Sequence, residues 1–170
     1  WRGSLGAPDG TGGSDFTGFP NRPYFMDLDD LRRPGDSPLL QVPMTIRPTR
    51  NPIAAALLPK VRGTPAQRVV ERVAGGEHVW LRPNGRNLGQ MQALVDRVLA
   101  EGAPVLEFMQ HSSEFMPGGS PLFANEAEIE RLYDHLERLF KSIAGRGITG
   151  MTLAEYRTAY AAGTARTVPG

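Results

Sequence analysis

Apolar residues spaced by three and four positions predict two amphipathic helices in the second half of the chain. The first follows Asn87 and ends at Gly102, and the second follows Asn125 and ends at Gly145. Asn125 stands three residues before Glu128, which is the spacing of a capping box. The two apolar faces comprise Leu88, Met91, Leu94, Val95, Val98 and Leu99, and then Ile129, Leu132, Tyr133, Leu136, Leu139, Phe140 and Ile143.

Short apolar runs predict strands at residues 39–46, 78–81, 104–109 and 148–151. Pro43 lies inside the first run and cannot donate a ladder hydrogen bond, so that strand is expected at a sheet edge or with broken pairing. Helix starts at Thr64 and Thr152 complete an alternation of strands and helices. Short connections between alternating elements favour parallel strands with crossover helices. The pattern therefore predicts an α/β fold, either part of a (β/α) barrel or an open α/β sheet.

The first part of the chain has a different composition from the rest. Ten of the 15 prolines lie in residues 1–65, and all ten glutamates lie at or after Glu71. Segment 1–36 is therefore expected to be irregular, because it lacks good helix formers and is rich in helix breakers. The 170 residues correspond to about one domain. We interpret residues 1–170 as a single partial domain, with an irregular loop or insertion at 1–36 and a β/α portion at 37–165.

Composition excludes several classes of protein. Lysine plus arginine number 19 against 18 for aspartate plus glutamate, and this balance argues against a nucleic-acid binder. The absence of cysteine excludes disulfides, thiolate metal sites and a cysteine nucleophile. The longest apolar run, residues 53–58, is far shorter than the roughly 20 residues that span a bilayer, so no transmembrane segment is expected.

His111 is the strongest candidate for chemistry. It ends the predicted strand 104–109 and enters a loop rich in serine, glycine and proline. Reacting groups of parallel α/β folds lie at the carboxyl ends of strands, and histidine is suited to proton transfer near neutral pH. The alternative is that His111 only caps the strand end. Glu107 lies on the same strand face, but four residues at about 3.3 Å each place it about 13 Å away.

Other polar residues give weaker signals. Arg47 and Arg82 each follow a predicted strand, and parallel strands would place both near His111, where they could bind an anionic or hydroxyl-rich ligand. The alternative is pairing with surface carboxylates. His78 and His135 are interpreted as structural. The acidic residues Asp27, Asp29 and Asp30 are interpreted as a solvated turn rather than a cation site, and no serine lies in a GxSxG elbow.

The run Met109-Gln110-His111-Ser112-Ser113-Glu114-Phe115-Met116-Pro117-Gly118-Gly119-Ser120-Pro121 resembles a segment near the end of bacterial polysaccharide deacetylases, the NodB-like carbohydrate esterases. Weaker matches occur in the same order along most of the chain. They are Asp15-Phe16, Pro20-Asn21-Arg22-Pro23-Tyr24, Leu40-Gln41-Val42-Pro43, Leu81-Arg82-Pro83 and Thr152-Leu153-Ala154-Glu155-Tyr156.

The resemblance implies a distorted (β/α) barrel that hydrolyses N-acetyl groups on a bacterial polysaccharide with a divalent metal, commonly zinc. It places His111 as the general acid, with Met109 where the family has leucine. The Thr-Phe-Asp-Asp and His-x-x-x-His motifs of the family's first half are missing. The chain is therefore expected to be the C-terminal half, with no metal and no turnover of its own, and to depend on the missing N-terminal half of the same protein.

Substrate contacts are expected from Arg82, Trp80, Arg47, Ser112 and Ser113. Trp1, Tyr24 and Trp80 could stack on sugar rings. The bacterial compartment, cytoplasm or periplasm, is left open. A second hypothesis is a non-catalytic carbohydrate-binding or assembly module that kept the fold without the metal site, and a third is a serine-dependent α/β hydrolase.

Overall fold

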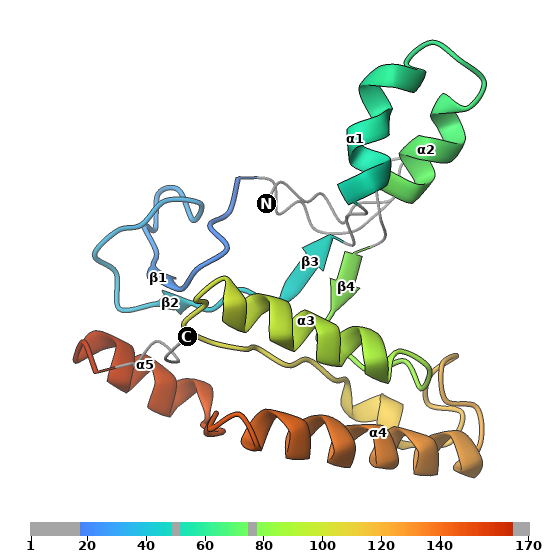
Figure 1. The fold of residues 1–170 in the computed structure, drawn as a ribbon. Helices are drawn as coiled ribbons and strands as arrows, with labels where there is room; N and C mark the ends of the chain where they lie inside the picture. The colour runs from blue at the N-terminus through green and yellow to red at the C-terminus, as the bar shows by residue number, and fades with distance from the viewer. Residues whose placement is uncertain (1–17, 49–51, 75–77, 165–170) are drawn as a thin grey trace. The chain divides into compact units, whose positions relative to one another are not determined.

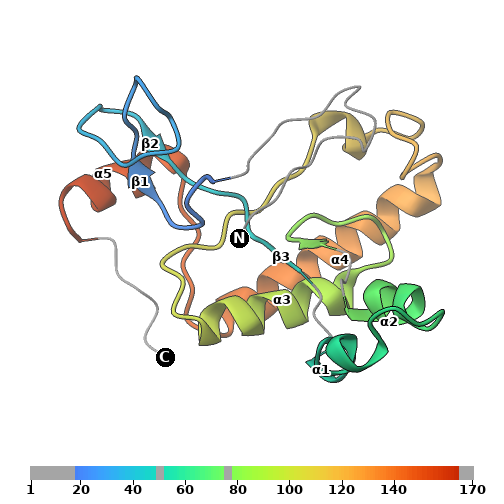
Figure 2. The same cartoon turned by 90° about the horizontal axis from the view of Figure 1, so that it is seen from above.

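The computed structural model describes residues 18–48, 52–74 and 78–164. Its helices and strands are labelled in Figures 1 and 2. The contacts within the chain divide it into two compact units. Unit 1 comprises Trp1–Met44, Leu99–Glu107 and Thr149–Gly170, and unit 2 comprises Thr45–Val98 and Phe108–Ile148. Trp1, Asp15 and Phe16, which carry part of the family resemblance and one predicted sugar contact, lie outside the described residues.

Unit 1 contains a short strand pair and the last helix. β1 (Tyr24–Phe25) pairs antiparallel with β2 (Leu40–Gln41). The Tyr160 ring of α5 (Leu153–Ala161) lies 5.6 Å from the ring of Phe25, and its hydroxyl donates to the Pro23 carbonyl at 2.8 Å. These contacts pack α5 against the strand pair.

The start of α5 agrees with the sequence prediction. The Thr152 hydroxyl accepts a hydrogen bond from the Glu155 N–H at 3.2 Å, and the Glu155 carboxylate accepts one from the Thr152 N–H at 2.7 Å. This reciprocal arrangement is a capping box, and it satisfies two N–H groups that the helix itself leaves free. The predicted helix start at Thr152 is confirmed.

Unit 2 contains the other elements. β3 (Ile46–Pro48) pairs antiparallel with β4 (His78–Trp80), and α1 (Pro52–Val61) and α2 (Gln67–Ala74) form a helical hairpin. The rest of the unit comprises the first eleven residues of α3 (Leu88–Ala100), the short 3-10 turn η1 (Ser112–Phe115) and α4 (Glu126–Ala144).

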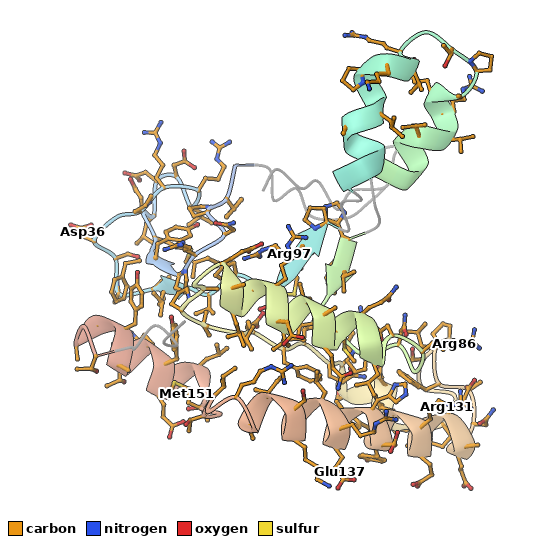
Figure 3. The ribbon with its side chains drawn as sticks, viewed as in Figure 1. Asp36, Arg86, Arg97, Arg131, Glu137 and Met151 are labelled. Carbon is orange, nitrogen blue, oxygen red and sulfur yellow. The ribbon has the colours of Figure 1, made fainter. Side chains whose placement is uncertain are left out.

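The core of unit 2 is formed by most of the apolar positions that the sequence predicted on α3 and α4. The predicted Leu99 and Ile143 are half-buried, and the predicted Tyr133 and Phe140 are exposed. The buried residues are Leu88, Met91, Leu94, Val95 and Val98 on α3, and Ile129, Leu132, Leu136 and Leu139 on α4. Phe123, with no exposed surface, joins the α4 residues in one cluster. The exposed side of α4 carries charged residues such as Glu137, which points away from the ribbon and pairs with Lys141 (Figure 3). It also carries the exposed rings of Tyr133 and Phe140.

The strands differ from the prediction in their partners. The expected strand 39–46 is divided at Pro43, so that β2 pairs in unit 1 and β3 pairs in unit 2. The two described pairs are antiparallel, not parallel. Residues 104–109 and 148–151 are not strands, although the Met109 N–H donates to the Leu81 carbonyl at 3.2 Å. The described part of the chain shows no closed barrel, and the (β/α) barrel stays a prediction.

The length and apolar character of the helices bear on the expectation of no transmembrane segment. Among residues 18–48, 52–74 and 78–164, no helix is both long enough and apolar enough to cross a lipid bilayer.

Candidate functional site

His111 stands where the extended backbone that follows Met109 turns into η1. Its backbone is extended, with φ −86° and ψ 142°, and it is the residue immediately before the turn. His111 and the two serines after it, Ser112 and Ser113, are exposed to solvent. The imidazole predicted to act as an acid is therefore accessible, and two hydroxyl-bearing residues adjoin it.

The backbone of His111 is held by a buried carboxylate. Glu114 is only 2% exposed, and its Oε2 accepts a hydrogen bond from the His111 N–H at 3.1 Å. In return, the Glu114 N–H donates to the His111 carbonyl at 3.0 Å. The other carboxylate oxygen, Oε1, accepts a hydrogen bond from Nη2 of Arg82. Both oxygens of Glu114 are thus occupied, one by the histidine backbone and one by the guanidinium.

Arg82 is placed by the backbone around it. The Leu81 N–H donates to the Thr45 carbonyl at 2.9 Å, and the Leu81 carbonyl accepts from Met109. The Arg82 carbonyl accepts from Nδ2 of Asn87 at 2.9 Å. Residue 82 is therefore fixed between the end of β4, the segment before His111 and the start of α3.

The pair matters electrostatically because a buried charge without a partner is costly. Removing one partner of a buried ion pair typically costs about 3–5 kcal/mol, since the other charge is left uncompensated. Glu114 is almost fully buried, whereas the Arg82 side chain is 28% exposed. The arginine therefore supplies the charge that allows a carboxylate to lie beneath the His111 backbone.

The loop after η1 depends on two glycines. Gly118 has a φ of +73°, in the left-handed region that glycine adopts without strain. At Gly119 a Cβ atom would lie 2.2 Å from the Ser113 carbonyl oxygen, so the two backbones approach too closely for any other residue. Phe123 then anchors the loop in the core, where Phe108 and Phe115 pack against its cluster. The Gly-Gly pair and Phe123 make the loop a fixed support for His111.

The antiparallel pairing separates the two predicted arginines. Arg47 lies opposite Val79, which precedes Arg82 by three positions, and the Arg47 Nη1 donates to the Ile46 carbonyl at 2.9 Å. The expectation that Arg47 and Arg82 share one rim rested on parallel strands and is wrong in that respect. Trp80 is half-buried in β4, opposite Ile46. The hydrogen bonds connect Arg82, through Glu114, to the backbone of His111.

Burial shifts the pKa values of Glu107 and His135. Burial raises the pKa of the Glu107 carboxyl. Burial lowers the pKa of His135, an effect that nearby Asp134 opposes. Both shifts arise mainly from desolvation, which disfavours the charged form. His135 is partly buried on α4, as expected of a structural histidine.

Buried amide and guanidinium groups lie close in sequence to the site. The two polar side-chain atoms of Gln110 and the Nε of Arg82 are buried without a hydrogen-bond partner in the described residues. Buried polar groups are nearly always bonded, often to ordered water.

The metal that the resemblance implies would need a cluster of ligating side chains. Within the described ranges, no group of three histidine, cysteine, aspartate or glutamate side chains could hold a metal ion. Asp30 pairs with Arg32, and Asp27 accepts from the Asp29 N–H at 2.8 Å. Asp27 and Asp30 thus bond to groups within their own turn. The described residues of this chain therefore provide no ligand set for the metal.

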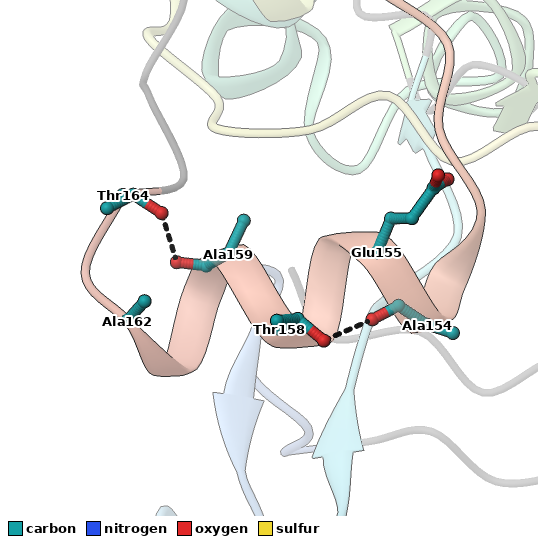
Figure 4. A pocket seen from close by; sticks show the side chains of 6 residues that line it. All are labelled: Ala154, Glu155, Thr158, Ala159, Ala162 and Thr164. Atoms are coloured by element: carbon teal, nitrogen blue, oxygen red, sulfur yellow. Dashed lines mark hydrogen bonds between the residues drawn. The ribbon is translucent and has the colours of Figure 1, made fainter.

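A surface pocket of about 480 Å³ lies on α5, away from His111 in sequence (Figure 4). Its hydroxyl groups are already used, since Thr158 donates to the Ala154 carbonyl at 3.0 Å and Thr164 to the Ala159 carbonyl at 3.2 Å. The Glu155 carboxylate caps the helix. The pocket therefore offers mainly small apolar side chains, and its polar groups are engaged by the helix itself.

Sequence reasoning missed the role of Glu114. The signal was present, because Glu114 follows His111 by three residues, the same spacing that identified the starts of α4 and α5. Arg82 lies 32 residues from Glu114, so no local pattern could have paired them. The Asn87 side chain accepts from the Asn84 N–H and donates to the Arg82 carbonyl, so it bonds the loop that precedes α3.

Comparisons with protein-family models, with curated proteins and with solved structures found no match for the chain. The resemblance to polysaccharide deacetylases therefore rests on the residues quoted above.

Proposed function

We propose that this chain is the C-terminal part of a metal-dependent polysaccharide deacetylase, in which His111 is the general acid. The observation that carries the proposal is the exposed imidazole on a backbone that Glu114 and the glycine-rich loop hold in place. The family resemblance of the same loop supports it. The substrate class is a bacterial polysaccharide that carries N-acetyl groups.

The chemistry of amide hydrolysis explains why such a residue is needed. Water adds to the acetyl carbonyl carbon, the C–N bond breaks, and acetate leaves together with a free amine. The amine nitrogen must gain a proton as the bond breaks, because an amide anion is a poor leaving group. The His111 imidazolium supplies that proton and is protonated again from solvent. The metal and the activation of the attacking water are assigned to the part of the enzyme outside this chain.

Ser112 and Ser113 are the proposed substrate contacts nearest to the acid. Both are exposed, and a hydroxyl can donate to or accept from a sugar hydroxyl. Trp80 and Arg47 are further proposed substrate contacts. Trp80 is the last residue of β4 and lies opposite Ile46, and Arg47 is the middle residue of β3.

The test is acetate release by the complete deacetylase that carries this chain. We expect His111→Ala to lower kcat by roughly 10²–10⁴-fold, the usual contribution of a general acid. His78→Ala is the matched control, because His78 is also exposed but lies at the start of β4, and it should keep near-normal kcat. A His111→Ala enzyme with near-normal kcat would contradict the assignment.

The carbohydrate-binding module is the alternative outcome of the same experiment. In that case the complete protein retains N-acetylated polysaccharide on an affinity gel but releases no acetate from it. Such a result would replace the enzymatic proposal.

A further inference from the structure

We infer that Glu114, held by Arg82, is the residue that positions His111 for proton transfer; this rests on the proposed function. Sequence reasoning placed Arg82 among the substrate contacts. The structure instead directs its Nη2 to Glu114, whose second oxygen accepts from the His111 N–H. The guanidinium thus acts on the reaction through two intermediate groups and does not touch the substrate.

His111 has little conformational freedom at its backbone. Its N–H donates to Glu114 Oε2 at 3.1 Å and its carbonyl accepts from the Glu114 N–H at 3.0 Å. The two bonds close a ring from residue 111 to residue 114. Because they fix the peptide groups on both sides of the Cα atom, they fix the direction in which the imidazole leaves the backbone.

The Glu114 side chain is also restricted to one rotamer by its hydrogen bonds. It is buried, so a change of rotamer would take the carboxylate away from both of its donors. Arg82 is in turn fixed by the bonds of Leu81 and Asn87. The exposed His111 is therefore held by the ion pair of Glu114 and Arg82, which connects η1 to the residues that follow β4.

Orienting the His111 imidazole is a different contribution from stabilising the fold. An imidazole that is exposed on a mobile backbone would still be an acid, but it would meet the leaving nitrogen in few of its orientations. A misplacement of about 1 Å can cost about 10²-fold in rate. The loss falls on kcat for substrates whose leaving group needs a proton, and KM stays similar.

The test compares two substrates in the complete deacetylase. N-acetylated polysaccharide needs a proton on its leaving amine, whereas 4-nitrophenyl acetate releases a stable phenolate that does not. Glu114→Gln keeps the volume of the side chain, but either Arg82 or the His111 N–H loses its acceptor. Glu114→Asp keeps the charge for Arg82 and is one methylene too short to reach His111 as well.

We expect both Glu114 variants to lower kcat on the polysaccharide by about 10²-fold and to keep most of the activity on the aryl ester. Glu137→Gln is the matched control, since Glu137 is also ion-paired but is exposed on α4, and both activities should stay unchanged. Equal losses on the two substrates would show a merely structural role and would overturn the inference, as would no loss on either.

A second readout does not depend on turnover. Hydrogen exchange of the His111 backbone amide, followed by NMR, should become faster in Glu114→Asp, because the donor loses its buried acceptor. An unchanged exchange rate would overturn the inference. If His111→Ala itself keeps full activity on the polysaccharide, the proposed function fails, and this result is distinct from a failure of the Glu114 variants alone.

Discussion

Substitution of Gly119 by alanine is the most direct perturbation of the support beneath His111. A Cβ atom at Gly119 would lie 2.2 Å from the Ser113 carbonyl oxygen and 3.2 Å from the Met116 Cβ. Favourable contacts between non-bonded heavy atoms lie at about 3.5–4.0 Å, so the first distance is short by more than about 1 Å. The atom that obstructs the methyl group belongs to the backbone of η1, which cannot rotate aside as a side chain can.

The cost of this substitution can be estimated from overpacking. Forced backbone shifts in well-packed regions cost about 1–3 kcal/mol, and we expect Gly119→Ala to lower the free energy of unfolding by an amount in that range. Gly89 is the matched control. It lies in α3, and no atom stands within 4 Å of the position that a Cβ would take there. Alanine at this position should raise the free energy of unfolding by about 0.5–1 kcal/mol, because glycine is a poor helix former.

The assay is urea unfolding of the two variants beside the parent chain, with the free energies compared at similar m values. The two substitutions add the same methyl group, and they should change stability in opposite directions, with a difference of about 1.5–4 kcal/mol between them. A Gly119→Ala chain as stable as the parent would refute the view that η1 and the following loop form a fixed structure.

Two further predictions concern the core and pH. Phe123→Ala should cost about 3–5 kcal/mol in urea unfolding, because Phe123 has no exposed surface, whereas Leu122→Ala, 42% exposed, should cost far less; similar losses would contradict the core assignment. Burial raises the pKa of Glu107, so the folded chain holds this proton to higher pH, and stability should fall as pH rises from the usual carboxyl range through the raised pKa. Glu107→Gln should remove that fall and raise stability at neutral pH, and an unchanged pH profile of unfolding would argue against it.

The helices could be predicted from sequence because their signals are local. Most residues of the predicted apolar spacing on α3 and α4 are buried, although Tyr133 and Phe140 are exposed. Asn125 accepts from the Glu128 N–H at 3.1 Å, as the capping pattern indicates. The limits of each element are set within a few residues of chain, where propensity and capping act directly.

Strand partners could not be predicted in the same way. Residues 39–46 have a continuous strand-like pattern, yet the chain uses them in two pairs on either side of Pro43. Pairing direction depends on which distant segment supplies the other half of the ladder, and the sequence pattern of one strand does not contain that information. Assuming parallel partners also led to the wrong expectation that Arg47 and Arg82 lie on one rim.

Part of the candidate site could be predicted from the sequence because its signals are local. His111 could be found from its place at the end of an apolar run, and Glu114 could have been found from its spacing. Arg82 belongs to the site only through a contact between residues 32 positions apart. Tertiary packing brings Arg82 to Glu114, where its positive charge compensates the buried carboxylate.

Proton donation from His111 to the leaving group can be tested by the dependence of kcat on leaving-group basicity. The measurement uses a series of acetylated substrates, from aryl esters to alkyl amides, with the complete protein that carries this chain and its His111→Ala variant. We predict a shallow dependence for the parent enzyme and a steep one for the variant, with the two rates converging on the least basic leaving groups. Parallel dependences for the two enzymes would contradict the claim.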